Sequence, residues 1–309
     1  MKVITLTLST AFDRHCFVKG FYPGKECLAE ILSIDAAGKG VNISRALKVS
    51  ETENLALIVT GSQNAGEYCD FLDKDGIAYK EIRLEGRIRE NITVHSENCG
   101  ETRISFAGFT AEDKLLDGVF EQISPQIEKN TIVTFTGSLP KGISIHSVYA
   151  FLEKIKHLEA RIVADSRSLS KDDLLHIRPW MIKPNEEEIE MYLGKKVENI
   201  SDIIEGAKQF SESGIENVLV SLGKQGMLLC KAGETYLAVP PEIEAVSTIG
   251  AGDSSIAGFI SAELSGLGIK DKLKSAVAFG SAACLTPGTN PPHAPDIAKI
   301  FDMVSVRKI

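Results

Sequence analysis

Several common features are absent from this chain of 309 residues, and each absence argues against a class of protein. None of its six cysteines forms a C-x-x-C pair, and no histidine lies at zinc-finger spacing, so we expect reduced thiols rather than disulfides or a zinc module. No run of about 18 apolar residues is present, so we expect no membrane-spanning helix. The net charge is −8 without any Lys or Arg block, which argues against nucleic acid or an anionic membrane as a partner.

The composition that is present is typical of an ordinary globular protein. Apolar residues make up 43% and charged residues 25%, which is enough for a sizeable core. Residues 1–6 have the pattern of a β-strand and lack the longer apolar core of a signal peptide, so we expect a cytoplasmic protein. With no repeat of fixed period, the length suits one large domain with an appendage, or two ordinary domains.

From about residue 110 onward, strand-like and helix-like stretches alternate. The expected strands are residues 131–135, 161–164, 180–183 and 217–221. The expected helices are residues 111–127, 145–158 and 203–211, with another that begins at Glu186. Such alternation predicts βαβ units and an α/β fold with a mostly parallel sheet covered by helices.

Two N-terminal segments, residues 14–35 and 78–106, carry short alternating strands with no helices between them. They predict a small antiparallel sheet that is inserted twice from the main domain. A strand cluster at the edge of an α/β domain is typical of a lid or of an oligomer interface. A plain extension of the main sheet is the alternative.

The strongest local motif is Gly-Ala-Gly-Asp at 250–253, followed by a helical pattern at 255–264. A glycine turn that opens a helix presents bare backbone N–H groups, which the helix dipole makes favourable for an anion. Asp253 beside a bound phosphate can take the proton of an attacking hydroxyl. The alternative is that Asp253 is an ordinary helix N-cap.

A second glycine-rich turn, Ala-Ala-Gly-Lys-Gly-Val-Asn at 36–42, precedes a helix. Glycines there allow close approach of a ligand, and Asn42 can donate and accept hydrogen bonds to sugar hydroxyls. The turn is not a Rossmann fingerprint, because Ile43 occupies the third glycine position. No Gly-Lys pair of the chain is followed by Ser or Thr, so a Walker A sequence is absent as well.

A third motif, Lys-Pro-Asn-Glu-Glu-Glu at 183–188, follows a strand and opens a helix. Asn185 and Glu188 share one face, where they can hold the water shell of Mg²⁺. An acidic first turn favoured by the helix dipole is the alternative. The loops at 137–142 and 221–226 also follow strands, and the carboxyl ends of strands are where open α/β sheets bind ligands.

These motifs, in this order, resemble those of the ribokinase-like (PfkB-type) carbohydrate kinase family, over nearly the whole chain. The resemblance is to its phosphosugar branch, which includes 1-phosphofructokinase, tagatose-6-phosphate kinase and the minor 6-phosphofructokinase. It implies one doubly wound α/β kinase domain over residues 1–309, with a β-sheet lid formed by residues of about 14–35 and 85–106. It also implies ATP and Mg²⁺ as cofactors, a small sugar phosphate as substrate, and a homodimer formed through the lids.

The resemblance further implies roles for individual residues. Asp253 is similar to the family's catalytic base, with an anion hole formed by Gly250, Ala251 and Gly252. The positions similar to those that bind the sugar phosphate are Asp13, Lys25, Gly38, Lys39, Gly40, Asn42, Arg89 and Ser138. The positions similar to those that bind the nucleotide are Lys183, Asn185, Glu188, Ser221, Gly223, Gly226, Thr248 and Gly280. Glu188 is also expected to hold Mg²⁺ through water. Arg89 suits the existing phosphate of the sugar, because a guanidinium can donate two parallel hydrogen bonds.

The exact substrate stays open, because the details of the motifs disagree. The first loop reads Ser-Thr-Ala-Phe-Asp at 9–13, where the family usually has Asn-Pro-Ala-x-Asp, and Lys25 resembles the minor 6-phosphofructokinase. The loop at 36–40 resembles 1-phosphofructokinase instead. We therefore expect fructose 1-phosphate as the substrate, with tagatose 6-phosphate and fructose 6-phosphate as alternatives.

Two other functions are compatible with the same scaffold. A nucleoside or ribose kinase is disfavoured by Arg87 and Arg89, because a neutral sugar gives these cations no anion to bind, although both arginines can also be plain surface charge. A non-catalytic sensor of sugar phosphates is disfavoured by the intact Asp253, because a sensor needs no base.

Overall fold

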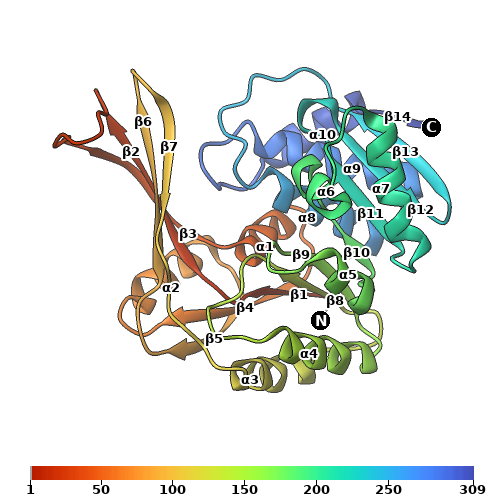
Figure 1. Ribbon diagram of the computed structural model, residues 1–309, viewed down its shortest axis with the longest axis horizontal. Coiled ribbons are helices and arrows are strands. Elements are labelled where there is room, and N and C mark those ends of the chain that lie inside the picture. The colour runs from red at the N-terminus through yellow and green to blue at the C-terminus, as the bar shows by residue number, and fades with distance from the viewer. Residues whose placement is uncertain (1) are drawn as a thin grey trace.

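The computed structural model describes residues 2–309, which form two β-sheets and the helices around them (Figure 1). The strands are β1 (Val3–Thr7), β2 (Ala11–Val18), β3 (Glu30–Ala37), β4 (Asn54–Gly61), β5 (Tyr79–Leu84), β6 (Arg89–Ser96), β7 (Gly100–Ser105), β8 (Ile132–Thr136), β9 (Arg161–Asp165), β10 (Met181–Ile182), β11 (Asn217–Ser221), β12 (Met227–Lys231), β13 (Glu234–Val239) and β14 (Ser305–Lys308). The α-helices are α1 (Lys39–Val49), α2 (Ala65–Asp75), α3 (Lys114–Ile123), α4 (Ile145–His157), α5 (Lys171–Ile177), α6 (Glu186–Leu193), α7 (Ile200–Glu212), α8 (Ala251–Leu264), α9 (Ile269–Ala283) and α10 (Ala294–Met303).

The large sheet has the strand order β14-β13-β12-β11-β10-β9-β8-β1-β4-β5. Every neighbouring pair from β5 to β11 is parallel. The strands β12, β13 and β14 continue the sheet as antiparallel neighbours at one edge. The predicted α/β class with a mostly parallel sheet is therefore confirmed, and the antiparallel edge is an addition that the sequence analysis did not predict.

Helices cover both faces of the large sheet because its central strands are apolar on both sides. Val3 of β1 belongs to one core together with Ile43 of α1 and Ile256 of α8. The next residue, Ile4, belongs to a second core together with Val148 of α4. Successive side chains of a strand point to opposite faces, so each face of the sheet has its own apolar core and its own helical layer.

The small sheet has the order β3-β2-β6-β7 and projects beyond the main body (Figure 1). The prediction that it is antiparallel is wrong for its central pair, because β2 and β6 run parallel. The strand β2 follows β1 and β6 follows β5, and β1 and β5 point the same way in the large sheet. The chain therefore enters β2 and β6 from the same end of the large sheet, in the same direction. Residues 79–84 of the second segment are β5 itself, paired with β4 in the large sheet.

Several element ends differ from the prediction. The helix expected at 111–127 is only Lys114–Ile123, because Thr110 bridges to Lys141 before it and a 3₁₀ turn containing Pro125 follows it. The helix expected from residue 255 already begins at Ala251, which places the glycine motif at its start.

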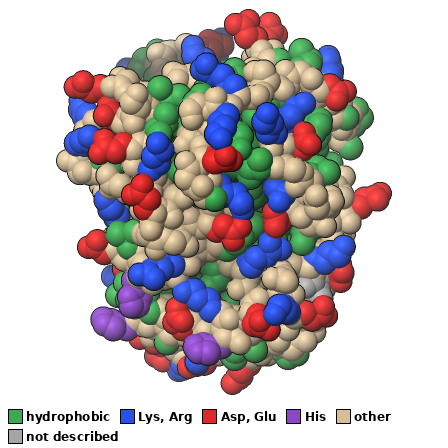
Figure 2. All heavy atoms as spheres, turned by 90° about the vertical axis from the view of Figure 1, so that its right-hand side faces the viewer, with side chains coloured by type: hydrophobic (Ala, Val, Ile, Leu, Met, Phe, Trp, Pro, Cys, Tyr) green, Lys and Arg blue, Asp and Glu red, His purple; other side chains and the backbone are tan. Residues whose placement is uncertain are grey.

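Surface charge of both signs is mixed on the face drawn in Figure 2, where Lys and Arg side chains lie among Asp and Glu side chains. Across residues 2–309, no helix has both the length and the apolar character needed to cross a membrane.

Candidate active site

Helix α8 begins at a glycine turn that exposes backbone N–H groups. Gly250 precedes the helix with a φ of 78°, a left-handed conformation that glycine adopts without steric cost. Asp253 lies in the first turn of the helix, and its residue surface is only 7% exposed. Because the N-cap is Gly250, the alternative that Asp253 caps this helix is wrong. A buried carboxylate thus stands at a helix N-terminus, where anions are stabilised.

Asn42, in the first turn of α1, holds the carboxylate of Asp253. Its Nδ2 donates to Asp253 Oδ2 at 2.8 Å, while its Oδ1 is buried and has no hydrogen-bond partner among the described residues. Burial raises the pKa of Asp253 to about 6, an effect that Lys39 opposes and Asp165 increases. A carboxylate with such a pKa is ionised at neutral pH and is a better base than an exposed one.

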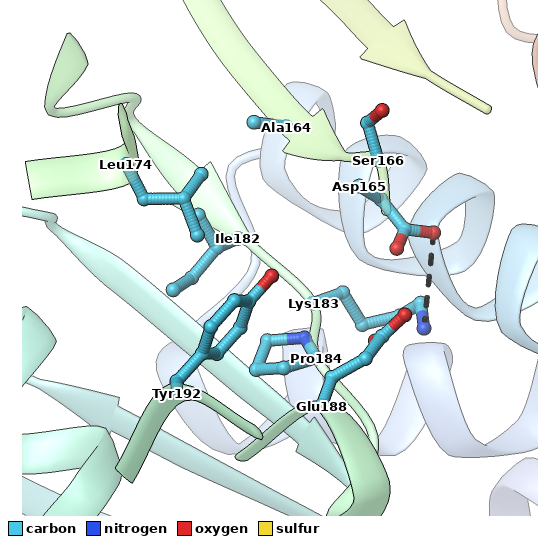
Figure 3. Close-up of a pocket in the computed structure, with 9 residues that line it drawn as sticks. All are labelled: Ala164, Asp165, Ser166, Leu174, Ile182, Lys183, Pro184, Glu188 and Tyr192. Carbon is cyan, nitrogen blue, oxygen red and sulfur yellow. Dashed lines mark ion pairs between the residues drawn. The ribbon is translucent and has the colours of Figure 1, made fainter. Parts of the chain in front are cut away.

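Three charged side chains meet at the carboxyl ends of β9 and β10. Asp165, the last residue of β9, accepts from Lys39 Nζ at 2.8 Å and lies 3.9 Å from Lys183 Nζ. Figure 3 shows Asp165 and Lys183 directed toward each other, with Glu188 beside them. Burial opposes ionisation of Asp165, but Lys183 and Lys39 outweigh it and hold the pKa of Asp165 below its ordinary value. The pKa of Lys39 is raised, because Asp165 and Asp253 outweigh its burial. Through these ion pairs, Asp165 holds the ammonium groups of Lys39 and Lys183 at the carboxyl ends of β9 and β10.

The small sheet carries a buried carboxylate with nitrogen donors around it. Asp13 of β2 accepts from Asn91 Nδ2 at 2.7 Å and from an Arg103 guanidinium nitrogen at 3.0 Å. Arg89, the first residue of β6, is partly buried, and its Nε has no hydrogen-bond partner among the described residues. Burial lowers the pKa of Arg89; Asp13 opposes this effect and Arg103 adds to it. Two guanidinium groups around one carboxylate leave positive charge available for an anion.

Asn185 and Glu188 form a capping box at the start of α6. Asn185 Oδ1 accepts from Glu188 N at 2.8 Å, and Glu188 Oε2 accepts from Asn185 N at 3.0 Å. Glu188 Oε1 accepts from Arg167 Nε at 3.3 Å. This pair therefore has a structural task as a helix cap, whatever else it does. Asn185 also bridges to Ser221, which brings the motif at the start of α6 beside the turn that follows β11.

Gly40 lies in the first turn of α1, and Gly223 begins a 3₁₀ turn after β11. The other residues predicted for the site lie in connections between elements; they are Gly38, Ser138, Gly226 and Thr248. Lys25 lies in the connection between β2 and β3, where its exposed ammonium stands over the ring of Tyr22, 5.5 Å from the centroid. Gly280 has a packing role between α9 and α8, because a Cβ there would lie 2.2 Å from Ser255 Oγ. The sequence analysis grouped Gly280 with the nucleotide-binding positions, and that role stays a prediction.

Two charged residues of this region were missed in the sequence. Asp165 follows the strand predicted at 161–164, and the rule that ligands bind at the carboxyl ends of strands was enough to find it. Arg103 lies in a segment of alternating short strands, and nothing in the local pattern separates an arginine that faces Asp13 from one that faces solvent.

This combination of an α/β sheet, glycine turns at helix starts, two lysines and a buried carboxylate is typical of a phosphotransferase that acts on a small hydroxyl compound. The model of the pfkB family of carbohydrate kinases matches residues 4–297, and the chain belongs to this family. It is a sugar-phosphate kinase, a phosphotransferase with an alcohol group as acceptor.

The relatives that match nearly the whole chain include proteins named 1-phosphofructokinase and a protein named 6-phosphofructokinase. The chain is 28% identical to the 1-phosphofructokinase of Escherichia coli (strain K12), over 99% of this chain and 98% of that protein. It is 26% identical to ATP-dependent 6-phosphofructokinase isozyme 2 of the same strain, over 99% of both chains. The crystal structure of phosphofructokinase-2 from Escherichia coli in complex with substrates and products superposes with a TM-score of 0.90 at 24% identity, over 98% of this chain and 99% of that one. The predicted family and fold are thereby confirmed.

Proposed function

We propose that this kinase transfers the γ-phosphate of ATP to a hydroxyl of a ketohexose monophosphate, with fructose 1-phosphate as the substrate and fructose 1,6-bisphosphate as the product. The observation that carries the proposal is the buried Asp253 at a glycine-rich helix start, bonded to Asn42. ATP as the donor is what the family implies.

In this proposal Asp253 accepts the proton of the attacking hydroxyl. The oxygen of that hydroxyl forms a bond to the γ-phosphorus, while the bond from this phosphorus to the β–γ bridging oxygen breaks and ADP leaves. Asn42 orients the base through its hydrogen bond of 2.8 Å. The backbone N–H groups after Gly250 face the phosphate oxygens, where they stabilise the developing charge.

Mg²⁺ is implied by the family resemblance, and the side chains near Glu188 fit it. Within residues 2–309, no group of three or more His, Cys, Asp or Glu side chains forms a metal cage. Mg²⁺ does not need one, since it commonly keeps several waters and binds through one or two carboxylates plus substrate phosphates. The Glu188 carboxylate accepts two hydrogen bonds and retains lone pairs for a metal-bound water. Bound there, the ion supplies neutralisation of the phosphate charge.

Arg89 supports a substrate that already carries a phosphate. Its guanidinium is partly buried beside Asp13 and Arg103, and its Nε lacks a partner among the described residues. A neutral sugar gives this charge no anion, whereas a phosphate accepts two of its N–H groups. The preference for fructose 1-phosphate over the 6-phosphates rests on the resemblance of the loop at 36–40 alone.

An ADP-release assay with wild-type protein tests the proposal across fructose 1-phosphate, fructose 6-phosphate, tagatose 6-phosphate, fructose and ribose. We expect the highest kcat/KM for fructose 1-phosphate. A higher kcat/KM for either 6-phosphate would overturn only the assignment of fructose 1-phosphate as the substrate. Better turnover of free fructose or ribose would overturn the phosphosugar assignment, and no turnover of any sugar would favour the sensor alternative.

We further propose that the small sheet is a lid and that two copies of the chain associate through it. The lid strands and their connection expose apolar side chains: Leu28 is 94% exposed, and Leu32, Ile31 and Phe106 are each more than half exposed. Burial of such side chains is favourable by about 25 cal/mol per Å². Leu28→Asp combined with Phe106→Asp should shift the mass in analytical ultracentrifugation toward the monomer. Met303→Asp, at an apolar residue of α10 that is 55% exposed, is the control. A wild-type monomer at all concentrations would contradict the proposed interface.

A further inference from the structure

Asp165 is a buried carboxylate that the proposed reaction does not use. Its side chain is 3% exposed, and it contacts two lysines from different motifs. Lys39 is the first residue of α1, in the motif predicted to bind the sugar phosphate, and Lys183 follows β10, in the motif predicted to bind the nucleotide. Figure 3 shows Lys183 directed toward Asp165. The backbone carbonyl of Asp165 also accepts from Gly137 N at 3.0 Å and lies 3.5 Å from Lys39 Nζ. One residue therefore connects the loops on both sides of the site.

We propose that Asp165 is a positioning residue that holds Lys39 and Lys183 on opposite sides of the transferred phosphoryl group. This inference rests on the proposed kinase reaction. Lys183 lies at the anion hole, because a Cβ on Gly252 would be 3.0 Å from its Nζ. Lysine side chains are flexible and lose rotamer freedom when they are fixed. A carboxylate that fixes both in advance lets them meet the phosphate without reorganisation.

Asp165 also acts on the base through its charge. The charged groups that influence Asp253 are Lys39 and Lys183, which favour its ionised form, and Asp165, which favours its protonated form. Removal of the Asp165 charge therefore makes Asp253 a weaker base, and it frees Lys39 to move toward Asp253. Both changes lower the pKa of Asp253, so the acid limb of the rate profile should move to lower pH.

Asp165→Asn is the direct test, because the amide keeps the shape and removes the charge. We expect kcat to fall about 10–100-fold, as a misplacement of about 1 Å can cost two decades. The KM for the sugar phosphate should change less than kcat does, because Lys39 loses one partner while the contacts around Asp13 are unchanged. The acid limb of kcat should move to lower pH. A purely structural role predicts instead a loss of folded protein with an unshifted limb.

Glu263→Gln is the matched control. Glu263 also joins two cations, Arg161 at 2.7 Å and Lys272 at 2.6 Å, but it lies near the opposite end of α8 from Asp253. This variant should keep the wild-type kcat and pH profile. An equal loss in both variants would overturn the positioning role, because it would trace the effect to stability.

Lys39→Met keeps the inference testable if Asp165→Asn does not fold. The side chain of Lys39 is 35% exposed, so its replacement should be tolerated. It should lose turnover and move the acid limb to higher pH, opposite to Asp165→Asn, because Lys39 lowers the pKa of Asp253. If either Lys39→Met or Asp165→Asn kept the kcat of the wild-type protein and the acid limb of its pH profile, the inference would be overturned. The kinase function would remain intact. No turnover by the wild-type protein would instead overturn the proposed function itself.

Discussion

The strand ends of the large sheet and the small sheet provide two kinds of polar site. At the strand ends, Asp253, Asp165 and Lys183 are buried and bonded within the site, on elements with apolar cores on both faces of the sheet. In the small sheet, Arg103 and Arg89 border solvent, and apolar side chains are exposed around them. We propose that the difference reflects a division of labour. In this proposal, the groups that transfer a proton and a phosphate stand on rigid elements, and the groups that recognise the substrate stand on an appended sheet that moves.

The largest expected effect is the loss of the base at the rigid site. Asp253→Asn should bind ATP normally and lose about 10²–10⁴-fold in kcat, because the amide is nearly isosteric but cannot accept the proton. Calorimetric titration measures the affinity for ATP, and single-turnover experiments measure the rate of phosphoryl transfer. A variant that keeps more than about half of the wild-type kcat would contradict the role of Asp253.

Substitution in the small sheet should affect selectivity rather than chemistry. Arg89→Ala should lower kcat/KM for the phosphosugar by about one to two decades, the equivalent of roughly 1.5–3 kcal/mol for a charge-assisted contact. Any weak activity on free fructose should hardly change. Arg87→Ala is the control, because Arg87 is exposed and pairs with Glu90. An equal loss on phosphosugar and free sugar would place Arg89 outside substrate recognition.

The rigid site should also impose a pH dependence. Burial raises the pKa of Asp253 to about 6, so the base is protonated below that pH and ionised above it. We expect kcat to fall about tenfold per pH unit well below 6 and to level off above 7. Rates measured from pH 5 to 8 check this expectation. A flat profile down to pH 5 would show that Asp253 keeps an ordinary carboxyl pKa or that proton transfer does not limit the rate.

The same division explains how much could be predicted from the sequence. Glycine turns and apolar periodicity are local signals, so the parallel sheet and the presence of a helix beside the glycine motif followed from them, although α8 begins four residues earlier than expected. Asp165 and Arg103 meet their partners only across long sequence separations, 126 residues from Lys39 and 90 from Asp13. A single sequence does not encode such contacts in a local pattern. The direction of β6 also depended on the sheet it leaves, which is why its parallel pairing with β2 was missed.

A smaller effect is expected at Glu188, where a cap and a metal role overlap. Glu188→Gln keeps an acceptor for Asn185 N, so α6 should remain capped and the unfolding temperature should stay close to wild type. The Mg²⁺ concentration for half-maximal rate should rise about tenfold, because the charge that orders the metal's water is lost. An unchanged Mg²⁺ curve would leave Glu188 with the capping role alone.

The smallest expected signal is a change in motion, and it tests whether the two regions differ in mobility at all. If the small sheet closes over bound sugar phosphate, amide hydrogen exchange in residues 14–35 and 85–106 should slow when ATP analogue and sugar phosphate are both present, since closure excludes water from the γ-phosphate. The central strands of the large sheet, such as β1 and β8, are the internal control, because their amides are already buried in parallel pairs and exchange only through rare opening. Protection confined to the small sheet would support a hinged lid on a rigid base. Protection shared equally by β1 and β8 would instead indicate global stabilisation by ligand, and no added protection in either segment would refute closure.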